Sequence, residues 1–187
     1  NHHKRLVMEN CFAVGLYRQG LLHDLSKYSP AEFLTGCRYY QGNRSPNAAE
    51  REAKGYSAAW LPHTGRNKHH FEYWIDVDMD RGFQVAGMRM PVKYVVEMFM
   101  DRIAASKTYL KEAYTDRSPL DYYNRSKKVM VIHPVTRRQL EILLHMLAKR
   151  GQEETFRYIR EHIIVSRSLN FERRDRHGKT ENSGGRR

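Results

Sequence analysis

Apolar residues recur at intervals of three and four through much of the chain, the spacing that places them on one face of an α-helix. The first such stretch predicts a helix over residues 3–18, with the apolar positions Leu6, Val7, Cys11 and Val14. Gly15 and Gly20 loosen the chain after it. A short second helix is expected to end near His23.

Helix start and stop signals divide the next part of the chain. Ser29-Pro30-Ala31-Glu32 combines an N-cap serine, a proline at the first helical position and the glutamate of a capping box. It predicts a helix to about Tyr40. The segments expected next are a loop over 41–47, a polar helix over 47–54 stopped by Gly55, two short helices between Tyr56 and Trp74 broken at 62–65, and an irregular segment or small hairpin over 76–89.

The longest helical pattern lies in the second half of the chain. Pro91 opens a helix that should reach about Tyr114, with an apolar face that includes Val95, Val96, Met98, Phe99 and Ile103. Two further helices are expected over 134–150 and 152–165, separated by Gly151.

These elements fit one helical domain over residues 1–165, and 187 residues suffice for a single hydrophobic core. The basic, glycine-containing tail over 166–187 is expected to be disordered. Alternating strands and helices, a glycine-rich phosphate loop and a nucleophile elbow are missing, which argues against a nucleotide-binding α/β sheet and a serine hydrolase. No run approaches the roughly 18 apolar residues of a membrane span. A cytoplasmic protein without membrane contact is therefore expected, and its oligomeric state is left open.

The formal net charge of +12 indicates an anionic partner, such as a nucleotide, another phosphate ester or nucleic acid. Part of this charge belongs to the tail and says nothing about the folded domain. Two cysteines, Cys11 and Cys37, are too few for a disulfide framework, and both are expected to be buried free thiols.

The segment Leu21–Lys27 carries the first candidate chemistry. His23 and Asp24 follow an apolar helix side by side, so that an imidazole and a carboxylate can reach one divalent cation. Lys27 lies one turn further on and could neutralise a bound phosphate. The alternative for Lys27 is a solvated side chain near a helix end.

This segment, followed by a capped helix, resembles the HD superfamily of metal-dependent phosphohydrolases, whose signature is His…His-Asp…Asp. The chain is more closely similar to an uncharacterised bacterial and phage family of HD-like proteins, over roughly residues 3–160. The segments that carry the likeness are CFAVGLYRQGLLHDLSKYSPAEF, YYQGNRSPNAAERE, GRNKHHFEYW and KYVVEMFMDRIAASKTYL. The resemblance implies an all-α, HD-domain-like helical bundle with a metal site between helices.

The resemblance also implies two further metal ligands, a histidine on the first helix and a final aspartate. His2 and His3 are both available, and His3 is favoured because Leu6 and Val7 share its inward side. Asp101 interrupts an apolar helix, where a carboxylate is costly unless a cation balances it. Its alternative is a buried salt bridge to another helix.

A third cluster runs from His63 to Glu72. His63, His69 and His70 resemble the extra histidines with which some HD proteins complete a second metal site, although Pro62 replaces a further histidine of the pattern. One or two ions are therefore expected. Arg66 and Lys68 suit a phosphate-bearing ligand, and Glu72 is a candidate general base whose alternative is a surface carboxylate. The remaining histidines, expected to be structural or solvated, are His133, His145, His162 and His177.

The expected function is metal-dependent hydrolysis of a phosphoester, with a nucleotide as the substrate class that the resemblance implies. Mn²⁺, Fe²⁺, Mg²⁺ or Zn²⁺ would serve, since ligand type does not choose among them. Two alternatives stay open. One is a non-catalytic, metal-stabilised protein that binds nucleic acid or has a structural role, and the other is a di-iron oxygenase of HD fold.

Overall fold

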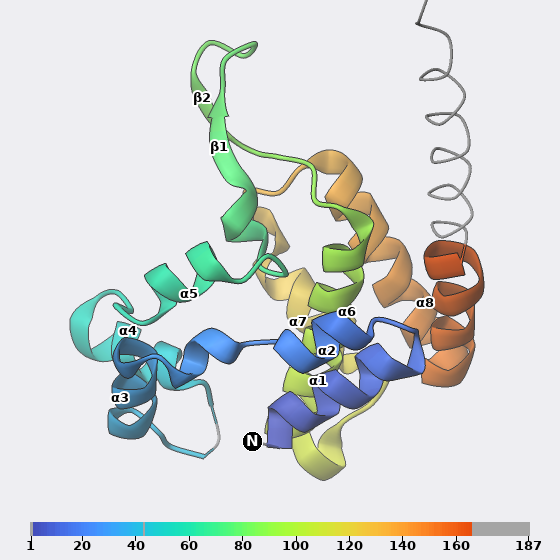
Figure 1. Ribbon diagram of the computed structural model, residues 1–187, viewed down its shortest axis with the longest axis horizontal. Coiled ribbons are helices and arrows are strands. Elements are labelled where there is room, and N and C mark those ends of the chain that lie inside the picture. Colours follow the sequence, from blue (N-terminus) through green and yellow to red (C-terminus); the bar gives the residue numbers. More distant parts are fainter. Residues whose placement is uncertain (1, 43, 166–187) are drawn as a thin grey trace, which may run out of the picture.

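The computed structural model describes residues 2–42 and 44–165, and nearly all regular structure in this part of the chain is helical (Figure 1). The helices are α1 (His2–Ala13), α2 (Tyr17–Leu22), α3 (Pro30–Arg38), α4 (Pro46–Lys54), α5 (Trp60–Arg66), α6 (Val92–Leu110), α7 (Ser118–Ser126) and α8 (Pro134–Tyr158). Short 3₁₀ turns cover Leu25–Tyr28, Phe71–Trp74, Lys111–Ala113 and Lys127–Val129. The predicted helical fold class is confirmed. The predicted tail, 166–187, lies outside the described residues.

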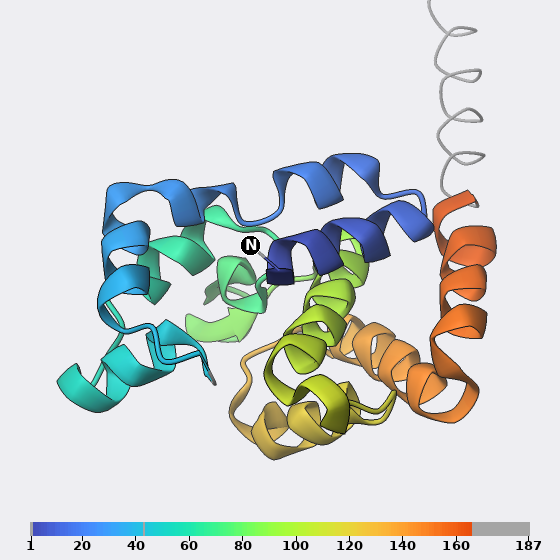
Figure 2. The ribbon, with the colours of Figure 1, turned by 90° about the horizontal axis from the view of Figure 1, so that it is seen from below.

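Helix α6 forms the centre of the core. Its residues from Val95 to Met100 are all buried, as are Ile103 and Ala104. Helix α1 packs on one side of α6, and α7 and α8 pack on others (Figure 2). The buried side chains that these three helices contribute are Val7, Cys11, Leu120, Tyr123, Leu140, Leu143, Leu144 and Leu147.

The first predicted helix is shorter than its apolar pattern suggested. Helix α1 ends at Ala13 because Gly15 adopts φ +84°, a left-handed conformation that reverses the chain. Helix α2 then runs back beside α1 (Figure 2). A Cβ at Gly20 would lie 3.1 Å from the carbonyl oxygen of Met8, so glycine permits this close approach. Helix α2 ends one residue before His23.

Between residues 56 and 126 one prediction is wrong and one helix was missed. The expected break at 62–65 is absent, because α5 runs without interruption from Trp60 to Arg66. Pro62 lies in the first turn of α5, where its missing N–H breaks no helical hydrogen bond. Helix α7 was not predicted at all, since its Ser-Pro start lies in a polar stretch.

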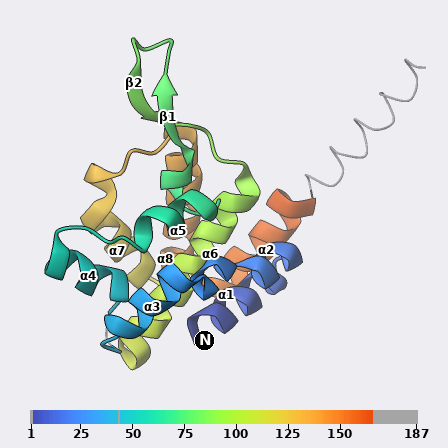
Figure 3. The ribbon, with the colours of Figure 1, turned by 60° about the vertical axis from the view of Figure 1, so that its left-hand side comes forward.

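The segment over 76–89 forms the small hairpin that was one of its two expected states. Strands β1 (Ile75–Asp78) and β2 (Gln84–Gly87) pair antiparallel, with Ile75 opposite Gly87 and Val77 opposite Val85. The hairpin projects from the helical body (Figure 3).

The helix boundaries and cysteines in the rest of the chain follow the predictions in part. Gly151 kinks α8 with φ 80° and ψ 173°, at the predicted separation, and residues Ile159–Ile164 continue as a wider π-helix. Cys11 is buried as expected, but Cys37 is exposed, because it lies on the outer face of α3. None of the helices described in residues 2–42 and 44–165 is long and apolar enough to cross a membrane.

Candidate metal centre

Five segments bring the predicted ligands together. Helix α1 supplies His3, α5 supplies His63, and α6 supplies Asp101. His23 and Asp24 come from the turn after α2, and His69 and His70 from the turn after α5. Ligand atoms lie within 4.8 Å of one another in three overlapping groups: Asp24, His63, His69 and His70; His3, His23 and Asp101; and His23, His69 and Glu97.

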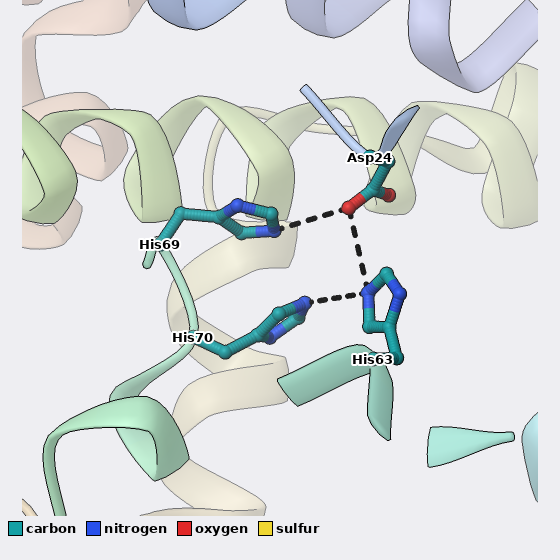
Figure 4. Close-up of side chains that lie close together, drawn as sticks. All are labelled: Asp24, His63, His69 and His70. Carbon is teal, nitrogen blue, oxygen red and sulfur yellow. Dashed lines mark hydrogen bonds and ion pairs between the residues drawn. The ribbon is translucent and has the colours of Figure 1, made fainter. Parts of the chain in front are cut away.

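The carboxylate of Asp24 lies between the first two groups. Its Oδ2 is 3.3 Å from Nε2 of His23, whereas its Oδ1 is 3.4 Å from Nε2 of His63 and 3.4 Å from Nε2 of His69 (Figure 4). One carboxylate therefore offers a different oxygen to each side, the arrangement by which an aspartate can bridge two cations.

The first side contains His3 and Asp101. Nε2 of His3 lies 3.0 Å from Oδ1 of Asp101, and the same oxygen is 3.7 Å from Nε2 of His23. His2 is exposed, so the choice between the two N-terminal histidines goes to His3. Among the residues that the structure describes, the ion pairs of Asp101 are with these two imidazoles and not with a lysine or an arginine.

The second side contains the imidazoles of His63, His69 and His70, and the indole of Trp60 packs against two of them. Nε2 of His63 lies 2.9 Å from Nε2 of His70, and His69 contacts Asp24 (Figure 4). The ring of Trp60 stacks on His63 at 5.3 Å and meets His70 edge-on at 4.8 Å. Pro62 stands where the resemblance led us to expect a further histidine, and three histidines meet here without it.

Two carboxylates that were not predicted as site residues contact the Nδ1 atoms of these imidazoles, on the side of each ring away from the centre. Oε1 of Glu97 is 3.1 Å from Nδ1 of His23 and 3.2 Å from Nδ1 of His69. Oε2 of Glu32 lies 2.7 Å from Nδ1 of His63. Such partners orient metal-binding histidines and leave Nε2 free as the ligand atom.

Glu97 had a signal in the sequence, and Glu32 had a misleading one. Glu97 precedes Asp101 by one helical turn within the same apolar run, where either carboxylate is costly unless a cation balances it. The capping box predicted for Glu32 is wrong. Its carboxylate instead accepts a hydrogen bond from the Ser26 hydroxyl at 3.0 Å and contacts His63, and Ser29 makes no side-chain cap.

Burial and close charges shift the pKa values of the centre in opposite directions. Burial alone would lower the pKa of His23, but the carboxylates of Asp24, Glu97 and Asp101 raise it to about 10. Despite burial, the His23 and Lys27 charges hold the pKa of Asp24 well below its usual range. Contacts with His3 and His23 likewise hold the pKa of Asp101 well below that range, against the effect of burial.

Other imidazoles of the centre are kept neutral. Burial lowers the pKa of His63, and burial together with the charge of His69 holds the pKa of His70 well below its usual range. Neutral imidazole is the form that binds a metal.

The donor set fits a divalent metal. Nε2 of His23, Nε2 of His69 and Oδ1 of Asp24 are buried and have no hydrogen-bond partner. Buried polar atoms without partners are rare in native structures, and a cation would satisfy all three. Mixed imidazole and carboxylate ligands suit Mn²⁺, Fe²⁺ and Zn²⁺.

The predicted catalytic and substrate-binding residues lie at different distances from this centre. Lys27 contacts it directly, with Nζ 2.5 Å from Oδ2 of Asp24. Arg66 is exposed, and its guanidinium lies 3.7 Å from Glu32. Lys68 is exposed and its Nζ lies over the ring of Tyr73, and no ion pair joins it to the centre within the described chain.

Glu72 is partly buried, contrary to its surface alternative. Burial raises the pKa of its carboxyl group, with the charge of Arg102 acting against that shift. The Oε2 atom of Glu72 is buried without a hydrogen-bond partner. It belongs to none of the three ligand groups found among residues 2–42 and 44–165.

Three of the four histidines that were expected to be structural or solvated lie within the described residues, and none of these three belongs to the ligand groups of the centre. His133 caps α8 by accepting the Val135 N–H at 3.1 Å, whereas His145 and His162 are exposed. His177 lies outside the described residues.

Comparisons with known proteins identify a family and no function. No curated protein and no solved structure matches this chain. A family model described as "Family of unknown function (DUF5662)" matches residues 1–146, which include every ligand of the centre. The chain therefore belongs to the DUF5662 family.

Proposed function

We propose that this protein is a metal-dependent phosphohydrolase of the HD type that acts on a small phosphate ester, with a nucleotide as its substrate class. The observation that carries the proposal is the placement of Asp24, whose two oxygens face two separate sets of imidazoles. The order His3, His23-Asp24, Asp101 is the one that the HD signature requires.

Access to solvent favours a catalytic centre over a purely structural one. Structural metal sites are closed by their protein ligands, whereas catalytic sites keep a position for water or substrate. Here the side chains of His3 and Asp101 are 23% and 21% exposed, and that of Lys27 is 49% exposed. A phosphate group could approach along this side.

Bound divalent ions would supply Lewis-acid polarisation of the phosphoryl group and a lowered pKa for an attacking water. The protein groups have separate roles. Lys27 places a positive charge beside Asp24, where it can bind a phosphate oxygen, and Arg66 adds a second charge at the edge of the centre. Lys68 would help only through a change of its rotamer, since its ammonium now faces Tyr73. Glu72 is the proposed proton acceptor, because burial favours its protonated form.

The test is phosphate release by purified protein that has been stripped with a chelator and reloaded with Mn²⁺, Fe²⁺, Mg²⁺ or Zn²⁺. The substrates are a panel of nucleoside mono-, di- and triphosphates and bis-p-nitrophenyl phosphate. Asp101→Asn should abolish turnover. Glu50→Gln is the control, because Glu50 is also a carboxylate within the fold, fully buried, but bonds to Ser57 and Lys54 away from the centre.

Metal-loaded protein without turnover on any of these substrates would contradict the proposal. Oxygen consumption by the Fe²⁺-loaded protein would instead support the oxygenase alternative. Salt-sensitive nucleic-acid binding that survives His23→Ala would support the non-catalytic one.

A further inference from the structure

Apart from Asp24 itself, Glu97 is the one carboxylate among the described residues that contacts imidazoles from both sides of the metal centre. It lies on α6, one turn before Asp101, and is buried. A single oxygen, Oε1, lies 3.1 Å from Nδ1 of His23 and 3.2 Å from Nδ1 of His69. His23 belongs to the side with His3 and Asp101, and His69 to the side with His63 and His70.

This contact decides which nitrogen of each ring faces the centre. A carboxylate oxygen accepts, so each Nδ1 must carry a hydrogen, and the lone pair of the neutral ring is then on Nε2. Both Nε2 atoms are buried without a hydrogen-bond partner. They approach different oxygens of Asp24, at 3.3 and 3.4 Å.

Helix α6 connects the two sides of the centre. The helix supplies Asp101, itself a candidate ligand, and through Glu97 it also contacts His23 and the turn that carries His69. Glu32 differs in this respect. It contacts His63 alone, at 2.7 Å, and therefore serves only one side.

We propose that Glu97 is a positioning residue shared by two metal sites. Its loss should weaken the binding of both ions, whereas loss of Glu32 should weaken the binding of only one. The inference rests on the metal centre of the proposed function but not on hydrolysis. Its alternative is that Glu97, with Nδ1 of His23 and of His69, itself binds a cation.

The experiment measures metal binding rather than turnover. Chelator-stripped protein is titrated with Co²⁺ and with Zn²⁺ by calorimetry, and bound metal is counted by elemental analysis. Loss of a carboxylate behind metal-binding histidines typically lowers metal affinity about 10–100-fold. Glu97→Gln should raise both dissociation constants to this extent, and Glu32→Gln should raise one. Glu50→Gln, which removes a buried carboxylate elsewhere, should change neither.

A second measurement uses the unaltered protein, in case Glu97→Gln does not fold. Long-range ¹H–¹⁵N spectra of the Zn²⁺-loaded protein should show His23 and His69 with a hydrogen on Nδ1 and zinc on Nε2. Zinc on Nδ1 of either ring would overturn the inference in favour of a cation at Glu97.

The remaining outcomes separate the two proposals. Fewer than two ions in the wild type, or a change in only one constant in Glu97→Gln, overturns the shared role. Absence of any bound metal overturns this role and the proposed hydrolase together. If two ions bind and the dissociation constants of the variants change as expected, but no phosphate is released, the shared role of Glu97 is supported and only the proposed hydrolase activity is overturned.

Discussion

Asp24 owes its position to an uncommon backbone conformation. Its φ of 53° and ψ of 28° lie in the left-handed region, which aspartate tolerates better than most residues other than glycine. The turn points the carboxylate inward from the end of α2, so that both oxygens meet imidazoles. Backbone strain of this kind is concentrated at functional sites.

The protonation of His23 predicts how metal binding depends on pH. In the metal-free protein the neighbouring carboxylates raise the pKa of His23 from the ordinary value of 6.5 to about 10. The charged ring therefore stabilises the folded, metal-free protein relative to the unfolded chain, and this stabilisation is complete below pH 6.5. This stabilisation is lost as the pH rises towards 10. A metal must displace the proton, so we expect affinity to rise about tenfold per pH unit per proton released.

Calorimetry with Mn²⁺ between pH 6.5 and 8, in buffers of different ionisation enthalpy, counts the protons released. His162→Ala, which removes an exposed histidine outside the centre, serves as the control. Equal affinity at both ends of this range would show that no proton is displaced.

The two cysteines should differ sharply in reactivity. Burial raises the pKa of the Cys11 thiol, with the charges of Glu97 and Asp101 adding to the effect, and its side chain is 0% exposed. Cys37 is exposed on α3. With a thiol reagent at pH 8 we expect one fast equivalent, abolished by Cys37→Ser, and a second only after unfolding. Two fast equivalents in the folded protein would contradict the burial of Cys11.

At the scale of elements, the hairpin and α8 meet through a glycine. A Cβ on Gly87 would lie 2.6 Å from the backbone nitrogen of His133 and 2.7 Å from the carbonyl carbon of Ile132. Backbone atoms cannot move aside as a flexible side chain can. The entry to α8 is also tied to the start of α6, since the Met90 N–H donates to Oγ1 of Thr136 at 3.0 Å.

Gly87→Ala should therefore destabilise the protein by about 1–3 kcal/mol, the usual effect of overpacking. Urea unfolding followed by circular dichroism measures the change. Gly36→Ala is the matched control, because a Cβ there has no neighbour within 4 Å and alanine favours its helix. Equal stability of Gly87→Ala and the wild type would contradict the close approach.

At the scale of the molecule, the helices converge on buried carboxylates. Asp24 and Glu97 are almost fully buried, and the pKa values of both stay below their usual range, because neighbouring imidazoles outweigh burial. Charges in such a place are costly unless they are balanced. A cation that joins α1, α5 and α6 through the centre should accordingly stabilise the whole fold.

Thermal unfolding should reveal this stabilisation. A metal present at about 100 times its dissociation constant contributes about 2.7 kcal/mol. For a protein of this size, that raises Tm by roughly 5–10 °C relative to the protein in chelator. His23→Ala should remove most of the shift, and His145→Ala, an exposed control, should keep it. An unchanged Tm in wild type would contradict a metal-stabilised centre.

Local signals predicted much of the helical framework and the candidate ligands. The Ser-Pro start of α3, the Gly55 stop of α4 and the Gly151 kink all depend on neighbouring residues only. The errors arose where local and distant contacts compete. Glu32 had a good capping position, but a buried imidazole 31 residues away takes its carboxylate. Residues 62–65 read as a break, but Pro62 fits the first turn of α5.

The amino-acid pattern by itself determined the helical class and which histidines and aspartates were unusual, because periodicity, caps and a polar residue in an apolar run are local properties. Only the tertiary structure decided that Asp24 offers one oxygen to each side, that His3 rather than His2 meets Asp101, and that Glu97 contacts two imidazoles. Those facts depend on how helices far apart in the sequence pack, and packing depends on shape and burial across the whole chain rather than on the spacing of residues along it.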